Sequence, residues 1–153
     1  MKKIELLNLL KELNFPKDEY YVLSGASLVL RGIKEEANDL DLCISAKLFN
    51  QIKDKFNLTD ERKNECGFYK INDNLEIVVD KKEDFKMEIG EKYNLEDLQT
   101  ILDFKLKRNK PKDKDDIENI AYLPWYGVQP EEDDIVTATF GNFGFYGEWE
   151  IKG

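Results

Sequence analysis

Two aspartates one residue apart, Asp39 and Asp41 in the segment "ANDLDLCIS", are the residues of this sequence best suited to chemistry. The alternating apolar pattern of residues 40–44 predicts a strand, in which both carboxylates point to one face, about 6–7 Å apart at the backbone. Leu40 and Leu42 then point to the opposite face, into a core. Two carboxylates placed in this way can bind a hard divalent cation, although an edge strand with one wet face has the same pattern.

A third carboxylate is expected from the segment "NLEIVVD" at residues 74–80. Glu76 interrupts an apolar run, where an unpaired charge is costly. If this segment forms a strand beside residues 40–44, either Glu76 or Asp80 completes an acidic triad. The alternative for Glu76 is the solvent-exposed face of a hairpin, and the choice between the two acids stays open.

Ser24 and Gly25 join a short β-rich run, residues 20–23, to a predicted short helix that ends near Gly32. A turn from a strand into a helix presents free backbone N–H groups at a positive helix terminus, which is an arrangement that receives phosphate. Ser24, Gly25 and Ser27 are therefore candidate phosphate-binding residues. Small residues are also common at such turns in proteins that bind nothing there.

The sequence contains no histidine, so a bound metal must be held by carboxylates and water. That favours Mg²⁺ or Mn²⁺ over zinc and leaves no Ser-His or Cys-His nucleophile. The net charge of −9 argues against non-specific binding to nucleic acid or to anionic membranes. Two cysteines without a C-x-x-C motif, and no apolar run long enough to span a membrane, favour a cytoplasmic protein.

The elements that must position these residues are predicted from periodicity and capping signals. The expected helices cover residues 3–13, 46–56 with Ser45 as N-cap, 94–109 with Asn94 as N-cap and Glu96 and Asp97 in the first turn, and 110–123. The expected hairpin pairs residues 67–71 with 75–80 across "NDN". The resulting class is α+β, with a small mixed β-sheet flanked by helices.

The composition changes at residue 124, after which five of the nine glycines and both tryptophans occur. We therefore expect one domain at residues 1–123 and a C-terminal β-hairpin appendage at residues 124–153, rich in aromatic side chains and glycine. Such an appendage is a candidate surface for binding a protein partner, or its aromatic residues complete the core.

In this order along the chain, "VLSGASLVLRGIKEEANDLDLCI" resembles the DNA polymerase β-type nucleotidyltransferase superfamily. More narrowly, it is similar to the small bacterial minimal nucleotidyltransferases, which include abortive-infection-type toxins of toxin–antitoxin systems and antibiotic-modifying adenylyltransferases. The segment "LDFKLKRNKPKDKDDIENI" resembles the helical region that follows the core in the toxin-like members. The sequence departs from the family pattern at Ser24, where glycine is commoner, and at Asn38, where a small hydroxyl residue is usual.

The resemblance implies a nucleotidyltransferase fold and a set of site residues. Ser24, Gly25 and Ser27 would hold the triphosphate, and Asp39, Asp41 and Glu76 would bind Mg²⁺ or Mn²⁺. Lys105 and Lys112 would contact phosphate or nucleotide. These are the residues that we expect in the site, with the alternative that both lysines lie on an ordinary solvated helix face.

The activity implied is transfer of NMP from an NTP to an acceptor hydroxyl by two-metal chemistry, with Glu76 as a metal ligand or general base. The acceptor is an RNA end, a protein or a small molecule. A different reading is an inactive nucleotidyltransferase-like module, or inhibitor, that acts through its aromatic C-terminal segment. A third is an ordinary α/β domain in which the motifs are accidental.

Overall fold

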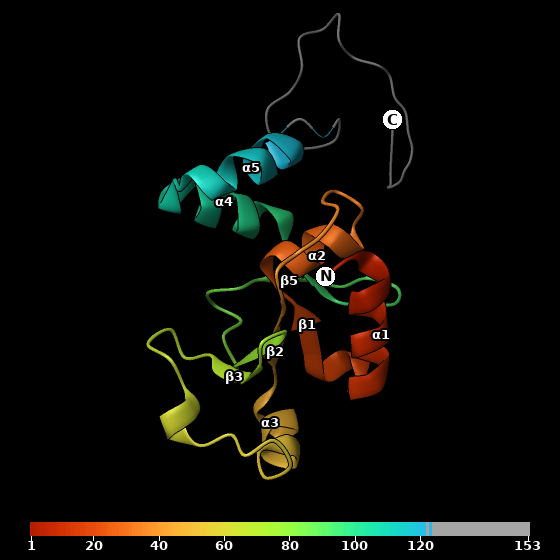
Figure 1. Cartoon of the computed structure of the whole chain (residues 1–153), viewed down its shortest axis with the longest axis vertical. Helices are drawn as coiled ribbons and strands as arrows, with labels where there is room; N and C mark the ends of the chain where they lie inside the picture. The colour runs from red at the N-terminus through yellow and green to blue at the C-terminus, as the bar shows by residue number, and fades with distance from the viewer. Residues whose placement is uncertain (122, 124–153) are drawn as a thin grey trace, which may run out of the picture. The chain divides into compact units, whose positions relative to one another are not determined.

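The computed structural model describes residues 1–121 and residue 123. The chain divides into two compact units, Met1–Ile101 and Leu102–Gly153, and one helix, α4, crosses the boundary (Figure 1). Within the described part of the chain, no helix is both long and apolar enough to cross a membrane. The predicted appendage at residues 124–153 lies outside the described residues.

The first unit is built on a six-stranded mixed sheet with the strand order β3-β4-β2-β1-β6-β5. The pairs β2–β4 and β1–β6 are parallel, and the other neighbouring pairs are antiparallel. The strands are β1 (Tyr20–Val22), β2 (Leu40–Ile44), β3 (Tyr69–Asn72), β4 (Leu75–Val79), β5 (Met87–Glu88) and β6 (Leu95–Glu96). This confirms the predicted mixed α+β class.

The helices of the first unit contribute to one core on one face of this sheet. The helices are α1 (Lys3–Leu13), α2 (Ser24–Leu30) and α3 (Ala46–Ile52), with short 3-10 turns at Lys17–Glu19 and Asp60–Arg62. Alternate strand residues such as Val22, Leu42 and Ile77 are fully buried in the same cluster as apolar residues of these helices. The opposite face carries a smaller cluster that includes Tyr21 and Cys43, partly covered by Phe85.

Most predicted elements of the first unit are confirmed. The first helix has the predicted limits, β2 coincides with the predicted strand, and the hairpin of β3 and β4 turns at residues 73–74. Ser45 is the predicted N-cap, because its hydroxyl accepts a hydrogen bond from the Leu48 N–H at 3.0 Å. The helix that it caps ends at Ile52, four residues earlier than expected.

The predicted start of the helix at 94–109 is wrong. The helix α4 runs from Leu98 to Arg108, and Leu95–Glu96 form strand β6 beside β1 and β5. Asn94 is buried and its side chain donates to the Lys17 carbonyl at 3.1 Å, so it does not cap the helix. Asp97 has that role, because its carboxylate accepts the Thr100 N–H at 3.0 Å. Pairing with existing strands has outweighed local helix signals here.

The second unit contains the rest of α4, a 3-10 turn at Pro111–Asp113 and the helix α5 (Lys114–Ala121). The helix predicted at residues 110–123 is thus divided, with proline at the first position of the turn and α5 following directly. Proline at that position is favourable because its missing N–H has no helical partner there.

Candidate active site

Asp41 and Glu76 are direct neighbours in the parallel pair of strands β2 and β4. Adjacent strands lie about 4.8 Å apart, and cross-strand partners share one face of the sheet, so the two side chains stand side by side. Leu40 and Leu42 are 0% exposed in the core on the opposite face, as the alternation predicts. The structure therefore brings together two of the three predicted carboxylates through the sheet register.

Asp80, the alternative third acid, lies elsewhere. It follows the end of β4, is exposed, has a left-handed backbone with φ 53°, and its N–H donates to the Ile44 carbonyl at 2.8 Å. Asp80 is four residue steps after Glu76, with three strand residues between them, which corresponds to about 13 Å along an extended chain. The acid placed beside Asp41 is Glu76.

The turn at Ser24 contains a carboxylate that the sequence did not reveal. The Ser24 N–H donates to Oε1 of Glu96 at 2.8 Å, and Glu96 is 3% exposed. Ser24 has a left-handed φ of 51°, and the Ser27 hydroxyl donates to the Ser24 carbonyl at 2.6 Å. The Ser24 backbone donor that was expected to face a phosphate is thus engaged by Glu96.

The sequence places Glu96 in the first turn of a predicted helix. A glutamate in that position is normally exposed to solvent and gives no indication of a functional role. A two-residue strand has no periodicity that could reveal it. The signal that could have helped is Asp97 followed three residues later by Thr100, because moving the N-cap to Asp97 leaves Glu96 outside the helix.

Four acids, Asp39, Asp41, Glu76 and Glu96, are called the carboxylate group below. The pKa of Asp41 is raised to about 7, first by burial and then by the negative charges of Asp39, Glu76 and Glu96. Oδ1 of Asp41 is buried without a hydrogen-bond partner. Asp39 is partly exposed, one residue before β2.

The carboxylate group fits a hard divalent cation by its chemistry, because carboxylate oxygens are the ligands that Mg²⁺ and Mn²⁺ prefer. Oδ1 of Asp41 has no hydrogen-bond partner and could therefore serve as a metal ligand. In the arrangement of residues 1–121 and 123, however, no three Cys, Asp or Glu side chains form a group that could hold a metal ion. The sheet register fixes the backbone positions of Asp41 and Glu76 beside each other.

Gly25 follows Ser24 inside α2, and neither its backbone angle nor its packing requires glycine. A Cβ added there would lie 3.5 Å from the Cβ of Ala37 and 3.8 Å from Nζ of Lys34, which are ordinary contact distances. Because the fold itself would accept alanine, close approach of a ligand to the backbone is a reason for glycine at this position.

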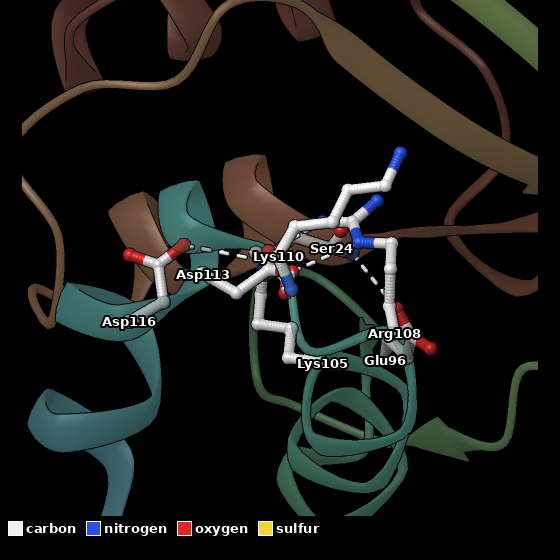
Figure 2. Close-up of polar contacts among 8 residues, drawn as sticks. Ser24, Glu96, Lys105, Arg108, Lys110, Asp113 and Asp116 are labelled. Carbon is white, nitrogen blue, oxygen red and sulfur yellow. Dashed lines mark hydrogen bonds and ion pairs between the residues drawn. The ribbon is translucent and has the colours of Figure 1, made fainter.

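The two predicted phosphate-binding lysines lie in the second unit. Lys112 is exposed. Lys105 is 4% exposed, with Nζ 3.2 Å from Oδ2 of Asp116 and 3.4 Å from Oδ1 of Asp113 (Figure 2). Lys105 is therefore held by two carboxylates, rather than extended on a solvated helix face.

Arg108 completes these contacts by pairing with Asp113, with its Nε 2.9 Å from Oδ2 (Figure 2). Hydrogen bonding from Arg108 holds the pKa of Asp113 well below its usual range, and Lys105 acts in the same direction. Lys105, Arg108, Asp113 and Asp116 are called the ion-pair network below. Charges of both signs are balanced within it.

Comparison with known proteins yielded no family model, no curated protein and no solved structure that matches this chain.

Proposed function

We propose that the protein is a metal-dependent nucleotidyltransferase that transfers NMP from an NTP to an acceptor hydroxyl, with pyrophosphate as the leaving group. The observation that carries the proposal is the register of β2 and β4, which sets Asp41 beside Glu76 on one face of the sheet. Beside Asp41 in the sheet, β1 leads directly into Ser24, Gly25 and α2. Strand, small turn, helix, paired aspartates and a later acidic strand occur in the order of the minimal nucleotidyltransferases, and we propose that fold.

The side chains of Asp39, Asp41 and Glu76 do not form a ready-made group of three metal ligands in the described structure, so they would have to turn toward one another to hold Mg²⁺ or Mn²⁺. The bound ion would supply positive charge to the triphosphate and to the acceptor oxygen. The mutual repulsion and burial that raise the pKa of Asp41 are relieved when a cation is bound among the acids. Asp41 is then ionised at neutral pH and can act as a metal ligand. The burial and the like charges around Asp41 are costly without a cation, and ionisable groups perturbed in this way are common at functional sites.

Glu76 is the candidate general base for the acceptor hydroxyl, since the chain has no histidine to take that role. Gly25 allows the triphosphate to approach the backbone closely. Positioning of the NTP and the acceptor supplies most of the catalysis expected in this class of reaction. The acceptor is an RNA end, a protein side chain or a small molecule, and a role as a toxin or defence enzyme is consistent with the resemblance in sequence.

The test is incubation of the protein with each of the four α-labelled NTPs, Mg²⁺ and a cell extract. We expect one class of molecule to become labelled, and we expect Asp41→Asn to lower the labelling by about a thousandfold or more. Asp80→Asn is the matched control, because that acid lies at the far end of β4, and labelling should persist. An Asp41→Asn protein with full activity would contradict the proposal.

A further inference from the structure

Glu96 joins strand β6 to the end of strand β1 through its side chain. Its Oε1 accepts the Ser24 N–H at 2.8 Å, although the two residues are 72 positions apart in the chain (Figure 2). Glu96 is 3% exposed, so the hydrogen bond is shielded from water. A charged acceptor also makes such a bond stronger than one between neutral groups. Glu96 therefore fixes the backbone at the point where β1 passes into α2.

The backbone conformation of Ser24 is one that must be held by its surroundings. Its φ of 51° lies in the left-handed region, which costs free energy for any residue other than glycine. The Ser27 hydroxyl donates to the Ser24 carbonyl at 2.6 Å, and Glu96 accepts the Ser24 N–H. A strained residue persists where contacts of this kind fix it, and Glu96 is the contact that comes from a distant strand.

The fixed segment is connected to Asp41 through Leu23. The Leu23 N–H donates to the Asp41 carbonyl at 2.8 Å, and Asp41 is the cross-strand partner of Glu76. One residue beyond the pair that joins β1 to β6, Glu96 lies beside Leu23. These four residues form a row across β6, the end of β1, β2 and β4, which are neighbours in the sheet.

The position of Glu96 in this row differs from that of Glu76. Glu76 is on the strand adjacent to Asp41, whereas Glu96 is two strands away, which corresponds to about 10 Å at the backbone. The carboxylate of Glu96 is also directed to the Ser24 N–H. This geometry suits a residue that holds the site in place, and Asp41 and Glu76 remain the proposed metal ligands.

We propose that Glu96 is a positioning residue, whose carboxylate holds the Ser24 backbone and, through Leu23, the segment of β2 that carries Asp41. The inference rests on the proposed function and adds to it a residue that the sequence motifs did not indicate. Because the role lies in the hydrogen bond to Ser24, an uncharged acceptor of the same length should replace the glutamate.

The experiment is titration of the full-length protein with Mn²⁺ alone, followed by electron paramagnetic resonance. Glu96→Gln keeps an oxygen acceptor at the same reach but removes the charge, whereas Glu96→Asp keeps the charge and is one methylene group shorter. We expect Glu96→Gln to bind Mn²⁺ within about threefold of wild type, and Glu96→Asp to bind about tenfold or more weakly. Glu91→Gln, which removes an exposed acid shortly before β6, is the control and should leave the affinity unchanged.

Amide hydrogen exchange of Leu23 and Ser24, measured by NMR, is the second readout. Exchange at both amides should be faster in Glu96→Asp than in wild type and nearly unchanged in Glu96→Gln. Thermal unfolding of each variant sets a temperature at which all of them are folded, so that a general loss of stability does not change the measured affinity.

The outcomes separate the two proposals. If wild type binds Mn²⁺ and Glu96→Gln binds it no more tightly than Glu96→Asp, the positioning role is overturned and the nucleotidyltransferase proposal stands. Absence of Mn²⁺ binding by wild type overturns both.

Discussion

The two units of this protein each gather four charged side chains, and they do so in opposite ways. In the carboxylate group, burial and then the negative charges of Asp39, Glu76 and Glu96 raise the pKa of Asp41 to about 7. In the ion-pair network, Lys105 and Arg108 face Asp113 and Asp116, and the pKa of Asp113 is lowered.

The difference indicates different roles. Opposite charges with good geometry satisfy one another, so removal of one member leaves a buried charge without compensation. Like charges gathered on one sheet face oppose folding, and such an arrangement persists when the ligand that it binds supplies the missing charge. The ion-pair network therefore stabilises the helices of the second unit, and the carboxylate group is the part that we expect to do chemistry.

The largest effect on stability is expected from breaking the ion-pair network. Lys105→Met should lower the free energy of unfolding by about 3–5 kcal/mol, because Asp113 and Asp116 lose a buried cation. Urea unfolding followed by circular dichroism measures the change, and exposed Lys112→Met is the matched control, for which no change is expected. If Lys105→Met is as stable as wild type and has lost NTP binding, Lys105 belongs to the site. The contrast drawn between the carboxylate group and the ion-pair network would then be wrong.

A smaller effect of opposite sign is expected for Asp41→Asn in metal-free protein. The pKa of Asp41 is raised in the folded protein to about 7, well above the usual range of aspartate, so ionisation of Asp41 destabilises the fold increasingly as pH rises from that range toward 7. At pH 8 the substitution should raise the free energy of unfolding by about 1–3 kcal/mol, and near pH 4 it should give no gain. Asp113, with its lowered pKa, has the reverse dependence, and its contribution is lost as pH falls below the usual range of aspartate.

Urea titrations of wild type and Asp41→Asn across this pH range, with chelator present, measure the difference. Asp80→Asn is the matched control, because that acid is exposed at the other end of the strand, and it should not reproduce the stabilisation expected of Asp41→Asn. A constant difference between Asp41→Asn and wild type at all pH values would show that the repulsion inferred among the four acids is absent.

The smallest effect on stability is expected at Gly25. Substitution there should change stability and activity in opposite directions. Gly25→Ala fits the packing and favours the helix, so the free energy of unfolding should rise by about 0.5–1 kcal/mol while NTP transfer falls sharply. Gly32→Ala is the contrasting control: Gly32 has φ +81°, and alanine there should lower stability by about 1 kcal/mol. Unchanged transfer by Gly25→Ala would place the triphosphate elsewhere.

Much of the fold was predictable because its signals are local. The amphipathic pattern predicted α1, the Ser45 cap predicted the start of α3, and two β-rich runs around Asn and Asp predicted the β3–β4 hairpin. The start of α4 was missed because Asn94 and Asp97 are both good N-caps, and local preference does not choose between them. Strand β5 was not predicted either, because its two residues are too few to show an alternating pattern.

The sequence by itself predicted that the side chains of Asp39 and Asp41 point to the same face of a strand, because alternation is a property of the chain alone. The lack of histidine likewise predicted that any metal must be held by oxygen ligands. The tertiary structure decided that Glu76, and not Asp80, stands beside Asp41, since strand register is a long-range property. It also placed Glu96 at Ser24 and Lys34 at Gly25. Contacts between segments far apart in the chain leave no periodic signal in the sequence, and they become visible when the sheet is assembled.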